Sequence, residues 1–188
     1  LRIGTVEHNI RSTSALYNDV KIVTLLINVS DQVGIRHEIQ NNGQIRKTIS
    51  LAIHADTQIY NNDDVPIYRV DPMKGFRFSD SGYEVYLLFL QSHEGHAAID
   101  SLWYGLWNNR TNNLWVNATS DRYTTGDSGL AYSWQNYTLN PGEKLNFTTA
   151  FTTDPYFNFS IIPSYIPTEP FTPSKVFTPS RKFTKSAV

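Results

Sequence analysis

The stretch Thr48-Ile-Ser-Leu-Ala-Ile-His-Ala-Asp-Thr-Gln-Ile59 alternates apolar residues with polar or small ones. Ile49, Leu51 and Ile53 fall on one face of an extended chain, which is the pattern of a strand with one buried face. A second run, residues 20–29, is almost continuously apolar and rich in β-branched residues. Such a run is typical of a strand covered on both faces, and we expect it to be central in its sheet.

Further strands are indicated at residues 83–90, 101–107, 114–117, 130–138 and 145–151. The polar segment 108–113 has the composition of a hairpin loop, and Asn140-Pro-Gly-Glu143 that of the turn of a second hairpin. Residues 8–16 fit a strand or a loop. Short strands about ten residues apart, without helical periodicity, predict an all-β fold, an antiparallel β-sandwich.

The composition excludes several classes of protein. The chain has 188 residues, with 16 basic and 17 acidic side chains and no cysteine. The near-neutral charge gives no electrostatic basis for binding nucleic acid, and the lack of cysteine excludes a disulfide framework and thiolate metal sites. No apolar run approaches the roughly 18 residues of a membrane-spanning helix. We therefore expect no transmembrane segment in this chain, with any signal or anchor lying outside it.

The composition changes at Pro163, because the residues from there onward hold five of the nine prolines and no glycine. A Phe-Thr-Pro-Ser hexad then repeats three times from Phe171 to Ser186, with Lys in place of Pro in the last copy. A repeat this short encloses no core, and six residues equal two turns of polyproline II helix. We expect a β-sandwich domain over residues 1–162 and a disordered Pro/Thr/Ser-rich stalk or linker over 163–188. A ligand strip for an aromatic-lined groove is the alternative.

The chain contains six Asn-x-Ser/Thr sequons, which are acceptors for N-linked glycans. Its 16 Asn and 34 Ser and Thr residues would produce about three by chance. Asn28 fits less well than the others, because it shares a strand face with apolar residues. The candidates for glycosylation are Asn109, Asn117, Asn136, Asn146 and Asn158. The excess favours an extracellular or cell-surface location.

Acidic residues gather at the end of the alternating strand and in the loop after it. Asp56, Asp63 and Asp64 could supply hard oxygen ligands to calcium, which is the one cofactor that the sequence suggests. The spacing of an EF-hand is absent, so a solvated turn is the alternative. His93-Glu-Gly-His96 lacks the helical spacing of a zinc motif and fits a loop better.

Four tryptophans are the strongest chemical signal in the chain. Trp103 and Trp107 share one face of the strand 101–107, and Trp115 lies across the predicted hairpin. This arrangement allows a flat aromatic platform of the kind on which sugar rings stack. Interior packing is the alternative for the same residues. The candidate ligand-binding residues are Trp103, Trp107, Trp115 and Trp134.

No residues form a convincing catalytic group. Gly126-Asp-Ser-Gly129 matches the residues around the nucleophile of trypsin-like serine proteases, with His54 and Asp100 as partners in chain order. Leu130 stands where that family has a further glycine, and the chain is too short for two barrels. Acid, glycine and serine are also ordinary turn residues. We therefore expect a protein that is not an enzyme.

Three segments resemble a large set of uncharacterised secreted or membrane-anchored proteins of trichomonad-type protists. They are Ala55-Asp-Thr-Gln-Ile59, Ile99-Asp-Ser-Leu-Trp-Tyr-Gly105 and Asp127-Ser-Gly-Leu-Ala-Tyr-Ser-Trp-Gln-Asn136, ahead of the Phe-Thr-Pro-Ser hexads. The resemblance implies a surface-exposed all-β module on a repetitive stalk, usually followed by a membrane anchor. It implies no activity and no catalytic residue.

The sequence thus predicts a non-enzymatic extracellular module of a cell-surface glycoprotein, acting in adhesion, display or recognition. A carbohydrate-binding β-sandwich that uses exposed tryptophans is the alternative. A hydrolase comes third, because no paired carboxylates or activated nucleophile stand at a suitable spacing. The expected partner is a glycan or another surface protein.

Overall fold

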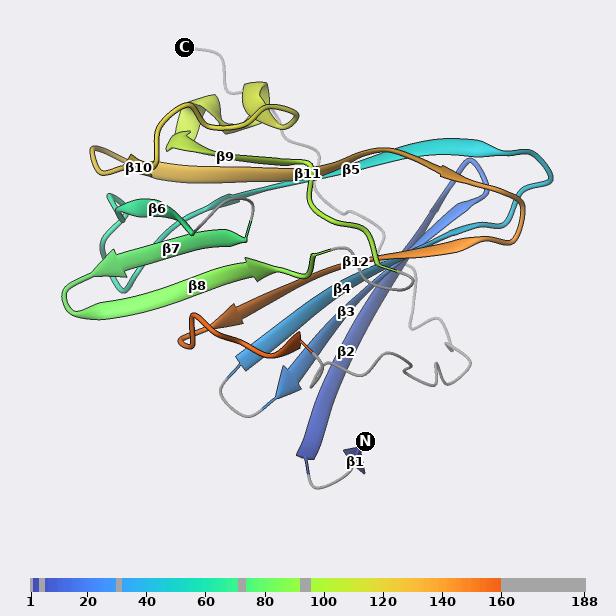
Figure 1. Ribbon diagram of the computed structural model, residues 1–188, viewed down its shortest axis with the longest axis horizontal. Coiled ribbons are helices and arrows are strands. Elements are labelled where there is room, and N and C mark those ends of the chain that lie inside the picture. The colour runs from blue at the N-terminus through green and yellow to red at the C-terminus, as the bar shows by residue number, and fades with distance from the viewer. Residues whose placement is uncertain (1, 4–5, 30–31, 71–73, 92–95, 160–188) are drawn as a thin grey trace, which may run out of the picture.

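The computed structural model describes residues 2–3, 6–29, 32–70, 74–91 and 96–159, which form two antiparallel sheets (Figure 1). The larger sheet has the order β1 (Arg2–Ile3), β2 (Val6–Tyr17), β3 (Val20–Val29), β4 (Gln32–Asn41), β12 (Lys144–Thr152), β8 (Tyr83–Phe89), β7 (Gly75–Asp80), β6 (Ile67–Val70) and β10 (Arg122–Tyr123). The smaller sheet has the order β5 (Lys47–Asp56), β11 (Ser128–Leu139) and β9 (Ser101–Leu106). The predicted all-β sandwich is confirmed.

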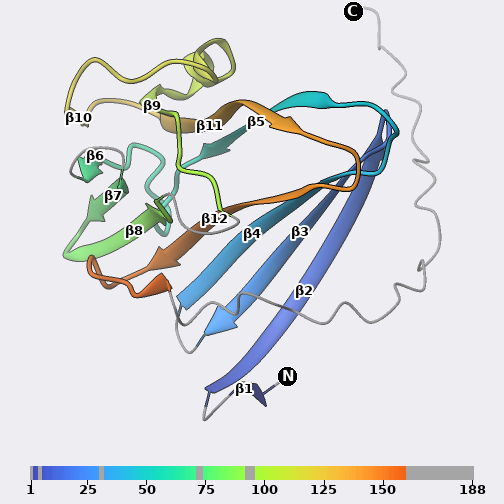
Figure 2. The ribbon, with the colours of Figure 1, turned by 45° about the vertical axis from the view of Figure 1, so that its right-hand side comes forward.

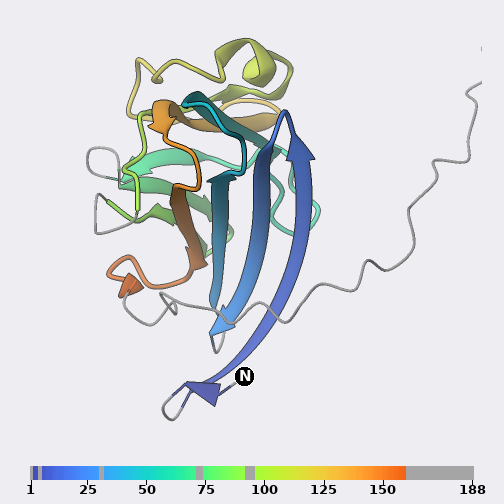
Figure 3. The ribbon, with the colours of Figure 1, turned by 90° about the vertical axis from the view of Figure 1, so that its right-hand side faces the viewer.

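The strands β2, β3 and β4 lie side by side in a long curved ribbon that extends beyond the smaller sheet (Figure 3). Asn18 and Asp19 connect β2 to β3 with φ angles of 47° and 63°, a conformation that Asn and Asp tolerate in tight hairpins. Residues 8–16, which fitted strand or loop, belong to β2. The sequence analysis did not predict β4, because Arg36, His37 and Glu38 interrupt its apolar pattern.

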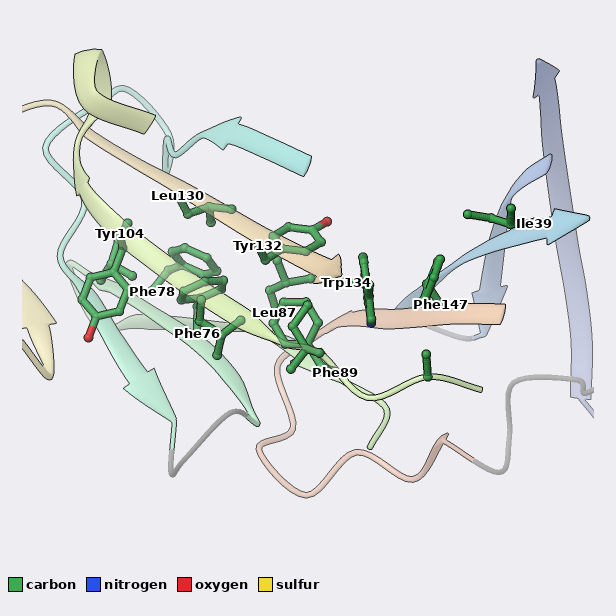
Figure 4. Packing of buried hydrophobic residues seen from close by; sticks show 14 of the residues in the cluster. Ile39, Phe76, Phe78, Leu87, Phe89, Tyr104, Leu130, Tyr132, Trp134 and Phe147 are labelled. Carbon is green, nitrogen blue, oxygen red and sulfur yellow. The ribbon is translucent and has the colours of Figure 1, made fainter. Parts of the chain in front are cut away.

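The main core lies between the two sheets and is rich in aromatic side chains (Figure 4). Phe76, Phe89 and Phe147 of the larger sheet meet Tyr132 and Trp134 of the smaller one. The Trp134 ring stacks on Phe147 with centroids 4.8 Å apart, and Phe89 meets Tyr132 edge-on at 4.9 Å. Such close aromatic pairs stabilise the core beyond the area that they bury.

A second apolar cluster covers the opposite face of the larger sheet and explains the two-sided run in β3. Val20 and Ile22 of that strand face the main core, whereas Leu25 and Ile27 join the second cluster with Phe157. β3 is therefore central, as predicted, but each end of the strand buries a different face. The strand β5 alternates as predicted, with Ile49, Leu51 and Ile53 packed against the main core.

Both predicted hairpins are wrong. Residues 107–113 form the 3-10 helix η1 (Trp107–Asn113), and residues 114–117 are not a strand, so nothing there pairs with β9. β11 and β12 follow one another through residues 140–143 but belong to different sheets (Figure 2). The buried Asn41 holds this connection, because its side-chain Nδ2 donates to Leu139 O at 3.0 Å and its backbone oxygen accepts from Gly142 N at 2.7 Å.

The predicted stalk, residues 163–188, and the domain boundary before it lie outside the described residues. Among the residues described, no helix combines the length and the apolar character needed to cross a membrane.

Candidate functional site

The outward face of the smaller sheet is built from small side chains. Alternation along β11 sends Leu130, Tyr132 and Trp134 into the core and leaves Gly129, Ala131 and Ser133 outward. The register places Ala52 and Gly105 on the same outward face, from β5 and β9. η1 lies over this floor (Figure 1).

Two glycines in this floor allow two indoles to lie close to the backbone. A Cβ added to Gly105 would stand 2.8 Å from Trp103 Cζ2, and one added to Gly129 would stand 2.9 Å from Trp107 Cε3. Both distances are shorter than a carbon–carbon contact permits. The Gly-x-Ser-Gly pattern of residues 126–129 therefore has a packing role at its last position.

The four tryptophans occupy three different environments. Trp134 is a core residue with 1% of its surface exposed, so its proposed ligand-binding role is incompatible with this structure. Trp103 and Trp107 are half-buried against the outward floor. Trp115 is 47% exposed and follows η1 instead of lying in a paired strand, so a platform made by hairpin pairing does not form.

The position of Trp115 is nevertheless fixed through its backbone. Its carbonyl oxygen accepts hydrogen bonds from Ser101 Oγ at 3.4 Å and from Gln135 Nε2 at 3.2 Å. Two residues further on, Asn117 Oδ1 accepts from Leu102 N at 2.8 Å, and Ala118 N donates to Leu102 O at 2.8 Å. The exposed indole thus projects from a segment that is tied to the edge of β9.

A cationic group that sequence reasoning missed lies beside these indoles. The Arg110 guanidinium lies over the Trp107 ring, its Nη1 donates to Trp107 O at 2.9 Å, and its Nε donates to His54 Nδ1 at 3.2 Å. Stacking of Arg on an indole face is favourable through the ring quadrupole. Trp107 was assigned to a predicted strand and Arg110 to the loop after it, so their spacing gave no signal for this contact.

Three aspartates converge where the loop after β5 meets the start of β11. Carboxylate oxygens of Asp56, Asp63 and Asp127 lie within 4.8 Å of one another. Burial and then the charges of Asp56, Asp63 and Asp64 raise the pKa of Asp127, while Arg110 opposes this effect. Within the described residues, Asp127 Oδ1 is buried without a hydrogen-bond partner. The structure thus joins two of the predicted calcium ligands to Asp127, with Asp64 outside the group.

Hydrogen bonds among neighbouring groups fix this acidic corner. Thr57 Oγ1 bonds to Ser128 O at 2.8 Å, Ser128 N donates to Asp63 O at 3.1 Å, and Trp107 N donates to Asp127 O at 2.9 Å. Ser128 is fully buried in these contacts. His54 accepts from Arg110 and Asp100 Oδ2 accepts from Gln135 N at 2.7 Å, so the three residues of the protease-like pattern each have a separate partner.

Most sequon asparagines are exposed. The exposed ones are Asn28, Asn109, Asn117, Asn136 and Asn158, whereas Asn146 is half-buried. Asn28 is accessible although its strand continues to Val29, contrary to our expectation for that face. Asn136 has φ 60° at a register shift in β11. Residues 92–95 of the His-x-x-His segment lie outside the described residues, and His96 Nδ1 bonds to Thr148 Oγ1 at 3.0 Å.

Neither a protein-family model nor a curated protein sequence matches this chain. The resemblance to surface proteins of trichomonad-type protists therefore rests on the sequence motifs alone.

Proposed function

We propose that this chain is a non-enzymatic extracellular module of a cell-surface glycoprotein, acting in adhesion, display or recognition. The observation that supports this proposal is the exposure of sequon asparagines in ordered parts of the structure. Asn109 lies on η1, Asn136 lies at the irregularity in β11, and both side chains are exposed. A bulky glycan on either residue would extend into solvent without displacing the core.

Expression in a glycosylating host, followed by intact-mass measurement, tests the proposal. We expect glycan mass at Asn109 and Asn136, lost separately in Asn109→Gln and Asn136→Gln. Asn108→Gln is the matched control, because Asn108 is an exposed neighbour that belongs to no sequon. Unmodified Asn109 and Asn136 in such a host would remove the support for an extracellular module.

A carbohydrate-binding role is the second candidate, and the half-exposed Trp115 favours it. An indole on a fixed backbone offers a flat apolar surface to a sugar ring, and Gln135 and Ser101 place polar groups at its base. We expect Trp115→Ala to abolish binding on a glycan array. Val116→Ala is the control, because Val116 is also 47% exposed. Equal binding by both variants, or no glycan bound by the unmodified chain, would exclude this role.

Calcium is the metal that we propose for the corner formed by Asp56, Asp63 and Asp127. Carboxylate oxygens are ligands that calcium prefers, and a bound divalent cation would relieve the repulsion from Asp56 and Asp63, which, after burial, raises the pKa of Asp127. We expect calorimetric calcium binding by the unmodified chain and at least tenfold weaker binding by Asp127→Asn. Asp80→Asn, at the end of β7, should bind normally. Equal affinities in the two variants would rule out this site.

A further inference from the structure

The strand β5 is the last strand on one side of the smaller sheet, so one of its edges faces away from β11. Thr57 N donates to Ser128 O at 3.2 Å, which marks Thr57 and Ser128 as a hydrogen-bonded pair. Because antiparallel pairs alternate, the odd-numbered residues of β5 bond to β11, and the even-numbered residues direct their N–H and C=O groups to the free edge. Within the described residues, no other strand pairs with that edge.

This free edge lacks the features that usually prevent strand addition. β5 is ten residues long, contains no proline, and carries its basic residue at its first position. On the inward face Ile49, Leu51 and Ile53 are only partly buried, so the rim of the main core is open along the same edge. A long, regular edge with a partly exposed apolar rim is a template for another strand.

Charges at the two ends of β5 are complementary. The acidic corner of Asp56, Asp63 and Asp127 lies at its C-terminal end. Arg46, immediately before its N-terminal end, is exposed and makes no ion pair within the described residues. An antiparallel partner strand reverses the order of the ends. A second copy of β5 would therefore place its Arg46 beside the acidic corner, twice in one interface.

We propose that the free edges of β5 in two copies of this chain pair antiparallel about a two-fold axis at Leu51. This register places Arg46 opposite Asp56 of the second copy, Thr48 opposite His54, and Ser50 opposite Ala52, all residues whose backbone groups face the edge. On the inward face Ile49 meets Ile53 of the second copy, and Leu51 meets its own counterpart, which closes the apolar rim. A shift of two residues in either direction removes the Arg46–Asp56 pairing, so charge selects this register.

The first test uses the full chain from a host that adds no N-glycans, in buffer with EDTA so that calcium has no influence. Sedimentation equilibrium should show the mass rising from 21.5 kDa toward twice that value with concentration. The amides of Ser50, Ala52 and His54 should become protected from hydrogen exchange over the same concentrations. A chain that stays monomeric at millimolar concentration, or a dimer in which these amides exchange freely, overturns the proposal. Protection already complete in the monomer also overturns it, because the chain then covers its own edge.

A charge exchange tests the register. Arg46→Glu and Asp56→Arg should each raise the dimer dissociation constant about tenfold, which corresponds to about 1.4 kcal/mol, and the double variant should restore it. Lys144→Glu makes an equal change of net charge at the exposed first residue of β12 and should leave the constant unchanged. Equal weakening by Lys144→Glu, or a double variant as weak as the single ones, contradicts the pairing. Exchange protection of the same amides in each dimeric variant shows that the fold is retained.

Discussion

Lowering the pH should destabilise this protein through His37 of β4. The side chain is 8% exposed, its Nδ1 lies 2.9 Å from Thr24 Oγ1, and its ring meets Trp134 edge-on with centroids 6.4 Å apart. Within the described residues, His37 Nε2 has no hydrogen-bond partner. Burial lowers the pKa of His37 to about 4, because a charged imidazolium loses its hydration in the core.

The stability falls as the pH falls because the pKa of His37 is lower in the folded chain than in the unfolded chain. The unfolded chain has the ordinary histidine pKa of about 6.5 and takes up a proton first as the pH falls. His37 therefore contributes its full stability above about pH 6.5 and loses it as the pH falls toward 4. The free energy of unfolding should fall by about 2 kcal/mol between pH 7 and pH 5, and by about 3 kcal/mol in total, at 1.36 kcal/mol for each pKa unit.

Urea unfolding at pH 7 and pH 5 measures this loss. His37→Gln removes the titrating group while retaining a side-chain amide that can reach Thr24, so the variant should lose about 2 kcal/mol less than the unmodified chain over that range. His54→Gln is the control for the substitution itself, because it makes the same change at an exposed histidine. If His37→Gln and the unmodified chain lose the same free energy, the buried neutral histidine is not the cause.

Three further changes test the packing and charges described above. Gly129→Ala should destabilise the fold by about 1–3 kcal/mol in urea unfolding, since its Cβ would collide with the Trp107 ring and backbone. Asn41→Ala should cost about 2–3 kcal/mol, because the buried carbonyl of Leu139 before the connection to β12 loses its donor, whereas Asn42→Ala at an exposed position should cost little. Arg110→Gln should raise the pKa of Asp127 in an NMR titration, because the guanidinium opposes the neighbouring carboxylates.

The fold class was predictable because alternation and β-branched runs report burial directly. β8 matched its predicted range to within one residue, whereas β5 keeps the predicted alternation but ends three residues earlier, at Asp56. β4 did not, because its buried Arg36 and His37 form polar contacts that only the tertiary structure reveals. Likewise, Asn140-Pro-Gly-Glu143 encodes a tight turn equally well within one sheet or between two. The choice depends on Asn41, which lies about a hundred residues earlier in the chain.

The candidate site was predictable in part. Asp56 and Asp63 were identified because they are close in sequence, whereas Asp127 joins them only through the pairing of β5 with β11. Residue type alone did not show which tryptophans are buried and which are exposed among Trp103, Trp107, Trp115 and Trp134. The alternation of β11 buries Trp134, the glycines of the outward floor accept Trp103 and Trp107, and the end of η1 leaves Trp115 exposed.

The features proposed for recognition all belong to the smaller sheet and the segments attached to it. β11 contributes to both the core and the outward floor. Its even-numbered residues from Leu130 to Trp134 face the core, and its odd-numbered residues form the outward floor. The free edge of β5 lies in the plane of the sheet, where the N–H and C=O groups that are unpaired within the described residues point away from β11. A substitution at Trp115, or at the exposed edge residues Arg46 and Asp56, therefore alters a proposed binding surface without removing a core contact, whereas Gly129→Ala on the buried outward floor also destabilises the fold. For this reason, loss of binding with an unchanged free energy of unfolding is the result that distinguishes recognition from structural support.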